Sequence, residues 1–583
     1  MSPLHPSLFT RPARTAVAVA CCLAAATQVA AQPVAPSNGP AASAVEESRQ
    51  QERVRALREQ QERAVDARLP AGPDPTSERL PQAETPCFRI DSITLVGESA
   101  ERFQWLLDAA SGIDADDSPT RRCLGARGID LVLTRLQQVL IARGWVTSRV
   151  LAAPQDLTTG RLALTLVPGR IAAIRDADRP GPPTMRLLGA LPMRPGDLLN
   201  LRDLEQGLEN LQRLPSVEAD IQIEPAAGPD ARPGESDLVI RHRQTRVLRA
   251  TLSLDDSGTR ATGKTQAGAT VAWDGPLGLN DLFYVSANHD AFNHTGQGTE
   301  GQTVHYSLPW GDWLVSATAS NNRWHQSVAG LAETYVYAGR ARHAEIRLSR
   351  LIHRDARRKI TLGLRGFHRN SESLLQDTEL PGQRRRVGGW ELSLHHREHI
   401  GRATLDGTLA FRRGTGAFRA LEAVEAGFGE GTSRMRLATS ELALSLPFSL
   451  GEHRFRYGAQ WRAQWNRTPL TPQDRFAIGS RYTVRGFDGE SSLLGDRGWL
   501  VRNDLCWVLD ATGSELYAGV DHGHVGGRAT ATLAGHDLTG AVIGLRGAWR
   551  GLGYDFFVGT PLRKPAGLTT PHRLFGFSLS YGF

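Results

Sequence analysis

The residues of this chain that could do chemistry are an arginine in a glycine-flanked turn and a short run of histidines. In "RYTVRGFDGE", Arg485 stands between Val484 and Gly486, with Phe487 and two acids behind it. A guanidinium that loses part of its water is best satisfied by bidentate contact with a carboxylate. Asp488, three residues on, is a local candidate for that contact. Composition alone would favour an exposed turn with an incidental arginine.

The histidine run comprises His395, His396 and His399. Histidines at this spacing can bind zinc on a helix, but the surrounding pattern predicts a strand, which turns neighbours to opposite faces. We therefore predict no metal site. The sequence also lacks a phosphate-binding loop, a nucleotide fingerprint and a serine elbow. It predicts no catalytic residues, no cofactor and no enzyme activity.

The charge balance is basic, with a net charge of +7 and an isoelectric point near 9.4 over 583 residues. A basic chain can indicate nucleic-acid binding. Here the arginines are spread along the chain instead of forming a run, so no nucleic-acid partner is predicted.

The first 31 residues are typical of a secretory signal peptide. Arg11 and Arg14 precede an apolar stretch, and Val29 and Ala31 occupy the small-residue positions of a cleavage site after Ala31. The alternative, a lipoprotein signal ending at Cys21, would leave an apolar core of only six residues after Arg14. No later run approaches the roughly 18 apolar residues of a spanning helix.

Residues 32–69 contain a helix, predicted at 45–69, that must lie in a polar setting. Residues 45–69 contain no glycine or proline and many good helix formers. Its apolar face is thin, so it cannot bury much core. We expect it either in solvent or in a polar cavity. A proline-rich linker, residues 70–86, follows.

Two small α/β domains are predicted next, at 87–168 and 169–243. Each shows the order strand, helix, helix, strand, strand, which makes them an internal repeat. The clearest helix is "LRDLEQGLENLQRLP", which carries Leu201, Leu204, Leu208 and Leu211 on one face.

Residues 244–583 alternate apolar and polar side chains in segments of about ten residues, the length of a tilted membrane-spanning strand. Either a soluble sandwich or an outer-membrane barrel would show this pattern. The chain end favours the barrel, because "FGFSLSYGF" places Phe575, Phe577, Leu579, Tyr581 and Phe583 on one face. Such a terminal strand must pair with the first strand, since an open edge is untenable in lipid. The length predicts about sixteen antiparallel strands.

Removal of the signal would leave three cysteines, Cys87, Cys123 and Cys506. In an oxidising compartment two of them can pair, and Cys87 and Cys123 frame one small domain. A bridge there would stabilise it by about 3–4 kcal/mol. The alternative is two buried free thiols. Cys506 is interpreted as a buried or lipid-facing small apolar residue on a strand.

Taken in order, these parts resemble the outer-membrane transporters of two-partner secretion, the TpsB family. The resemblance rests on segments in both α/β domains and in the barrel: "CFRIDSITLVG", "IARGWVTSRVLAAPQDLTTGRLALTLVPGRI", "GDLLNLRDLEQGLENLQRLPSVEADIQIEP", "LDDSGTRATGK", "GPLGLNDLFYVS", "YTVRGFDGE" and "LYAGVDHGHVGG". It implies a mainly β fold with α/β repeats: a transmembrane antiparallel barrel of about sixteen strands, preceded by two periplasmic POTRA domains and an N-terminal plug helix.

The resemblance also assigns the arginine. It implies that the loop carrying "VRGF" folds back into the barrel lumen and that Arg485 meets Asp521 on the inner wall. The loop motif comprises Val484, Arg485, Gly486 and Phe487, and the wall motif comprises Gly519 and Asp521. Asp488 remains the local competitor. His522 and His524 are expected on one face beside Asp521, where they would titrate in the lumen.

Two further features take their meaning from the resemblance. The helix at 45–69 is similar to the plug helix that occupies the lumen at rest. Cys87 and Cys123 match a subset of the family, the haemolysin and contact-dependent toxin exporters.

The expected function is export. POTRA domains would recognise an unfolded large exoprotein with an N-terminal secretion domain (a haemolysin, adhesin or contact-dependent toxin), and the barrel would pass it to the cell surface without nucleotide hydrolysis. Outer-membrane lipid would surround the barrel, and the barrel assembly machinery would insert it. An alternative is an assembly factor that inserts other barrels, since such proteins share the loop motif. A passive porin is a further alternative, but it has no reason to carry two periplasmic α/β repeats.

Overall fold

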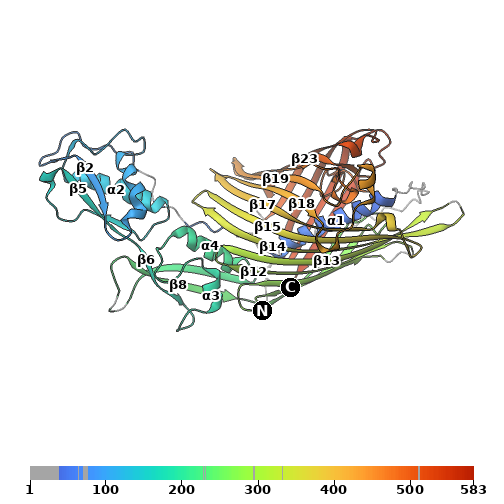
Figure 1. Ribbon diagram of the computed structural model, residues 1–583, viewed down its shortest axis with the longest axis horizontal. Helices are drawn as coiled ribbons and strands as arrows, with labels where there is room; N and C mark the ends of the chain where they lie inside the picture. The colour runs from blue at the N-terminus through green and yellow to red at the C-terminus, as the bar shows by residue number, and fades with distance from the viewer. Residues whose placement is uncertain are drawn as a thin grey trace, which may run out of the picture. The chain divides into compact units, whose positions relative to one another are not determined.

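The structure is a computed structural model that describes residues 39–62, 65–69, 72, 76–227, 229, 231–292, 296–330, 332–509 and 513–583. The predicted signal peptide, residues 1–31, and part of the predicted linker lie outside the described residues. Along the described chain a helix comes first, then two α/β domains and a closed barrel (Figure 1). The predicted fold class is confirmed. Within the described ranges, no helix is both long and apolar enough to cross a membrane.

The first α/β domain packs two helical segments against two small sheets. β1 pairs with β3, and β5 lies between β2 and β4 with β2 parallel to it. Its core gathers Phe103, Leu106, Leu136, Leu140 and Leu164. The elements are β1 (Phe88–Ile90), β2 (Ser92–Val96), the 3-10 helix η1 (Ala100–Ser111), β3 (Arg122–Leu124), α2 (Ala126–Ala142), β4 (Arg149–Leu151), η2 (Leu157–Thr159) and β5 (Arg161–Val167).

The second α/β domain repeats this order around one three-stranded sheet. β8 lies between β6, to which it is parallel, and β7. The four leucines predicted on one helical face are all buried. The elements are β6 (Arg170–Asp176), α3 (Met185–Ala190), α4 (Leu201–Gln212), β7 (Val217–Pro225) and β8 (Glu235–Gln244).

Sixteen long strands of the described chain, with the two-residue β16, form the closed antiparallel barrel. The barrel strands are β9 (Leu248–Asp255), β10 (Gln266–Asp274), β11 (Leu282–Asp290), β12 (Gly298–Trp310), β13 (Trp313–Ala329), β14 (Thr334–Arg354), β15 (Arg358–Leu375), β16 (Thr378–Glu379), β17 (Arg385–Ile400), β18 (Ala403–Thr415), β19 (Arg436–Leu450), β20 (His453–Asn466), β23 (Arg497–Leu509), β24 (Ser514–Gly526), β25 (Asp537–Trp549), β26 (Leu552–Arg563) and β27 (Leu574–Gly582).

The last strand closes the barrel onto the first. Leu579 pairs with Leu254 and Tyr581 with Leu252, and the Phe583 and Ala250 backbones exchange two hydrogen bonds of 3.0 Å. Phe577 joins at the far end, where its amide donates to the Asp256 carboxylate at 3.0 Å. The ladder therefore runs to the final residue, and the described barrel has no open edge.

The strands alternate in direction from β9, which follows directly from the second α/β domain. The connections after β20 and after β24 therefore lie at the end of the barrel away from that domain. Several strands are longer than the roughly 9–11 residues that cross a bilayer; β14 has 21. The barrel wall thus extends beyond the membrane. Short 3-10 helices decorate its connections: η3 (Pro381–Gln383), η4 (Ala417–Arg419), η5 (Val424–Phe428), η6 (Pro472–Asp474) and η7 (Arg528–Thr530).

The N-terminal helix is observed as α1 (Gly39–Gln61), so it begins and ends earlier than the predicted 45–69. The C-terminal part of the predicted helix is not helical and instead binds the second α/β domain. The Ala67 and Leu69 amides donate to the carboxylates of Glu209 and Glu205 on α4, at 3.3 and 2.9 Å. These contacts replace further helical hydrogen bonds, which is why local propensity places the end of the helix too late.

The predicted linker, 70–86, is not free along its whole length. From Thr76 onward it packs on the first α/β domain: the Thr76 amide donates to Gln138 at 2.7 Å, and the Leu80 amide donates to Asp117 at 2.7 Å. Leu80 itself is buried in that domain's core. A proline-rich composition does not reveal these attachments, because they depend on side chains far along the chain.

Candidate functional site in the barrel lumen

The loop that carries Arg485 lies between β20 and β23 and folds back onto the inner wall. Two short strands, β21 (Phe476–Ile478) and β22 (Leu493–Gly495), pair to form its stem. Val484 and Phe487 are fully buried at its tip, in a cluster with Leu500, Val525 and Leu538 of β23 to β25. This cluster holds the tip against the wall.

Arg485 binds two carboxylates and is 4% exposed. Its Nε and Nη2 donate to the two carboxylate oxygens of Asp521 at 2.7 and 2.8 Å, and its backbone N donates to the same group at 2.9 Å. Nη2 also donates to Asp504 at 2.6 Å. The contact implied by the resemblance is present. Asp488 instead accepts a hydrogen bond from the Glu490 amide at 3.2 Å.

Asp504 was not predicted from the sequence. It lies on β23 in register with Gly519, two residues from Asp521 along the neighbouring strand, so Arg485 reaches both acids at once. The alternating pattern could have placed the Asp504 side chain on the inward face of its strand. Only the strand register, which the sequence does not give, places it beside Gly519 and Asp521.

Glycines make the close approach possible. Gly486 has φ +100°, and a side chain there would meet the Thr560 carbonyl oxygen at 2.5 Å. A Cβ at Gly519 would lie 2.9 Å from Arg485 Nη2, and one at Gly540 would collide with the Arg485 carbonyl oxygen. Gly540 is a further position that sequence reasoning missed.

Tyr517 shares the inward face with Asp521. It is buried, and its hydroxyl donates to Asp555 at 2.9 Å. His522 and His524 lie one and three residues from Asp521 and therefore point outward, which corrects their expected place in the lumen. Strand alternation decides this, and the His522 ring accordingly lies 5.4 Å from the ring of Trp499, tilted by 53°, on the outer face where Trp499 is exposed.

Helix α1 lies inside the lumen (Figure 1), so of the two settings expected from its thin apolar face, solvent or a polar cavity, the polar cavity holds. It contacts widely separated parts of the wall through ion pairs. The pairs are Glu47 with Arg369 at 3.1 Å, Glu52 with Arg462 at 2.7 Å, Arg55 with Glu441 at 2.5 Å and Arg58 with Glu345 at 2.9 Å. Buried charges are tolerated there because they are paired.

The helix also touches the arginine loop. The Arg49 guanidinium donates to the Gly489 carbonyl, two residues after Phe487. Glu46, one turn earlier, pairs with Arg49 at 2.7 Å and accepts from Thr262 at 3.1 Å. A movement of either the helix or the loop must therefore disturb the other.

Where the second α/β domain meets the barrel, charged side chains again form the contact. Arg354 on β14 binds Glu205 and Glu209 of α4, both at 3.0 Å. Burial, together with the carboxylates of Asp312 and Asp197, raises the pKa of Asp203 on the same helix to about 6.

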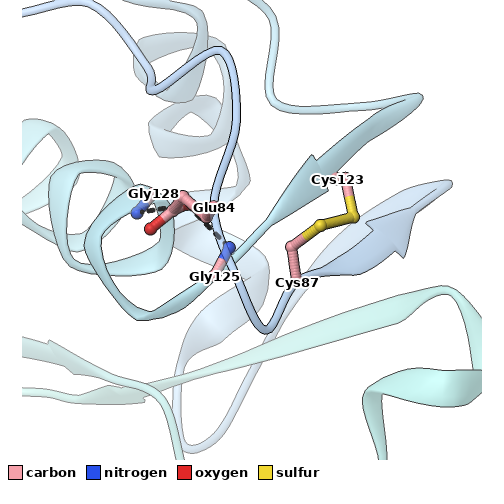
Figure 2. The surroundings of a disulfide bond; sticks show 5 residues. All are labelled: Glu84, Cys87, Cys123, Gly125 and Gly128. Carbon is pink, nitrogen blue, oxygen red and sulfur yellow. Dashed lines mark hydrogen bonds between the residues drawn. A yellow bond between two sulfur atoms is a disulfide. The ribbon is translucent and has the colours of Figure 1, made fainter.

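Cys87 and Cys123 form a disulfide with a Cα separation of 5.3 Å (Figure 2). Beside it, the Glu84 carboxylate accepts from the Gly125 and Gly128 amides at 2.7 and 3.0 Å. A carboxylate at a helix N-terminus is favourable because the first amides there lack partners. The linker thus ends by capping α2.

The histidine run and Cys506 are the remaining candidates from the sequence. In the residues that the structure describes, no group of three potential metal ligands is found. His395 and His396 are adjacent on β17 and point to opposite faces. Cys506 is buried and faces the lumen, with Arg546 Nη2 3.0 Å from its sulfur, so of the two expected settings the buried one holds.

Comparison with known proteins decides the family. The model for the haemolysin secretion/activation proteins ShlB/FhaC/HecB matches residues 234–547, a POTRA model matches 170–225, and a ShlB-type POTRA model matches 116–169. The outer membrane transporter CdiB-2 of Burkholderia pseudomallei is 36% identical over 95% of this chain and 97% of its own. The chain belongs to the ShlB/FhaC/HecB family.

Solved structures agree with this transporter's fold. CdiB from Acinetobacter baumannii has a TM-score of 0.81 at 28% identity, covering 93% of this chain and 99% of its own. CdiB from Escherichia coli has a TM-score of 0.83 at 24% identity over the same shares. The transporter is a two-partner secretion protein with its barrel in the outer membrane and its POTRA domains in the periplasm. Membership of this family favours the export function over the assembly-factor alternative.

Proposed function

We propose that this transporter exports one large exoprotein of the contact-dependent toxin class, and that α1 and the arginine loop are the two gates of its lumen. The observation that carries the proposal is the direct contact between the gates: Arg49 of the helix binds the backbone of the loop at Gly489. A chain entering the lumen must displace the helix, and its departure removes a support of the loop.

The POTRA domains would recognise the N-terminal domain of the exoprotein. Each has a sheet edge that is free in the described structure, such as that of β7 beside β8. An extended segment can add to such an edge through backbone hydrogen bonds. The second domain is joined to the barrel by Arg354 and α4, so it would deliver the bound segment at the barrel mouth.

Release of α1 needs no nucleotide. The helix is held mainly by charge pairs, with small apolar contacts such as that of Ala42 with Trp324 and Tyr337, and an incoming polar chain can exchange for such pairs one at a time. Folding of the exoprotein outside the cell would give the direction. No catalytic step is required of the transporter. Lipid would surround the barrel, and the barrel assembly machinery would insert it.

Co-expression tests the proposal. The exoprotein encoded beside the transporter would be produced with the full-length chain, with a variant lacking residues 39–61, or with no transporter, and assayed in the medium and the periplasm. We expect the exoprotein in the medium only when a transporter is present. The full-length chain and the deletion variant are compared at equal barrel abundance. The exoprotein trapped in the periplasm in every case would contradict it.

A further inference from the structure

A pocket of about 1050 Å³ lies on the outside of the barrel, over the ends of β20, β23 and β24 that face away from the POTRA domains. Strand alternation fixes its side. Arg462 and Leu500 point into the lumen, so Trp461, Trp465 and Trp499 point outward. Trp465 and Trp499 are 46% and 38% exposed, and they form an aromatic floor at the membrane surface.

Cations line the mouth of this pocket. Arg467, Arg497 and Arg528 are exposed there, and no carboxylate in the described part of the chain lies within ion-pair distance of their guanidinium groups. Most lumen arginines named above, by contrast, are paired. Three unpaired guanidinium groups beside an aromatic floor indicate an anionic partner.

Gly526, which has no side chain, leaves space between two hydrogen-bond donors, Arg497 and His524. A Cβ at Gly526 would lie 3.5 Å from Arg497 Nε and 3.6 Å from His524 Nε2. The other ring nitrogen of His524 lies 2.8 Å from Asp537, which directs Nε2 to the pocket side. Asp496 also lines the pocket, but it is buried and accepts from the Ala529 amide at 3.0 Å.

An aromatic girdle alone does not explain this arrangement. Tryptophans mark both membrane interfaces in barrels, yet a girdle requires neither a pocket nor clustered arginines. A free anion would be served by the arginines without the tryptophans. The combination suits an amphiphile with an anionic headgroup, as do other basic pockets at membrane surfaces.

We propose that this pocket binds the phosphorylated glycolipid of the outer leaflet, lipopolysaccharide. Its phosphates bind Arg467, Arg497 and Arg528, and the junction of its sugars and acyl chains lies on Trp465 and Trp499. The position selects this lipid, because the pocket is at the barrel end opposite the periplasmic domains and so faces the outer leaflet.

The pocket also stands at both roots of the arginine loop. Arg467 follows the last residue of β20, and Arg497 is the first residue of β23. A lipid bound between them ties the two ends of the loop together. If the loop acts as the gate proposed above, the lipid holds the frame in which that gate moves.

The test uses the purified full-length chain in detergent, titrated with rough lipopolysaccharide and followed by tryptophan fluorescence. The test variant combines Arg467→Gln, Arg497→Gln and Arg528→Gln. The matched control combines Arg419→Gln, Arg563→Gln and Arg573→Gln, which are exposed arginines outside the pocket. Heat-modifiable mobility on gels verifies that every barrel is folded.

We expect the control to bind as the wild type does and the test variant to bind about tenfold more weakly or worse, because a charge-assisted contact is worth about a factor of ten. Trp465→Ala with Trp499→Ala should also weaken binding, measured for this variant by the lipopolysaccharide that stays bound to the purified chain, because the fluorescent reporters of the pocket are removed. Equal binding by both triple variants would overturn the proposal. So would equally tight binding of phosphatidylglycerol vesicles, or displacement by millimolar inorganic phosphate, which would indicate a simple anion site.

Discussion

Replacing Arg485 by alanine should loosen the in-folded loop from the barrel wall. The change removes three side-chain hydrogen bonds to Asp521 and Asp504 and leaves Asp521, 0% exposed, with Arg502 as the remaining cation at 3.9 Å. Removing one partner of a buried ion pair costs about 3–5 kcal/mol. The other anchor, burial of Val484 and Phe487, contributes about 1.5–3 kcal/mol per side chain. The two anchors are thus of similar size.

The expected result is a loop that opens more often from an intact barrel. A loss of about 3–5 kcal/mol corresponds to an increase of about 100-fold to 1000-fold or more in the open population, at 1.4 kcal/mol per factor of ten. The hydrogen-bonded ladder of the barrel does not include the loop. The abundance of the folded barrel should therefore be nearly unchanged, while secretion of the exoprotein falls. Hydrogen exchange reports the opening directly, because the Arg485 amide is itself bonded to Asp521.

A matched control is available in the same loop. Arg475 is partly buried and lies 3.8 Å from Asp496, too far for a strong pair, so Arg475→Ala should leave exchange at the "VRGF" tip near the wild-type rate. Arg485→Lys keeps the charge without the bidentate fork and should fall between. The reasoning is refuted if Arg485→Ala and Arg475→Ala show the same protection at the tip.

Three other perturbations have defined outcomes. Reducing the Cys87–Cys123 bridge, or replacing both residues by serine, should destabilise the first POTRA domain by about 3–4 kcal/mol, measured by denaturant unfolding; an unchanged midpoint would contradict the loop-entropy estimate. Asp203 has a pKa raised to about 6, so it binds a proton more readily in the folded state, and its stabilising contribution is lost as pH rises through that value. The thermal midpoint should therefore be higher near pH 5 than near pH 7, and Asp203→Asn should flatten this difference; a slope that persists in the variant would point to another group. Arg369→Gln combined with Arg462→Gln removes two ion pairs of α1 and should raise the conductance of the barrel in planar bilayers, whereas conductance equal to wild type would show that other contacts retain the helix.

The barrel could be predicted from sequence because its signal is local and repeated. Alternation along each strand sets the inner and outer faces, and the aromatic strand ending at Phe583 requires closure. The repeat of two α/β domains is visible for the same reason: each helix carries its leucines at helical spacing.

Contacts between distant segments could not be predicted in this way. Asp504 joins the arginine site only through strand register, and the end of α1 is decided by Glu205 and Glu209, more than a hundred residues further on. His522 and His524 differ from these cases, because their outward direction could have been predicted. They lie one and three residues from Asp521, so strand alternation alone places them on the opposite face.

The attachment of Thr76 to the first POTRA domain limits how far the plug can travel. If α1 leaves the lumen as proposed, and Ala67 and Leu69 release α4 with it, the covalent tether is the segment from residue 62 to residue 75, and a chain of that length spans at most roughly 50 Å at about 3.5 Å per residue. A group confined to such a radius remains at an effective concentration in the millimolar range. On the proposed mechanism, the released helix would therefore compete for the lumen throughout transport. The exoprotein would have to occupy the pore continuously to keep it open, and the pore would reseal by an intramolecular step when the last segment has passed.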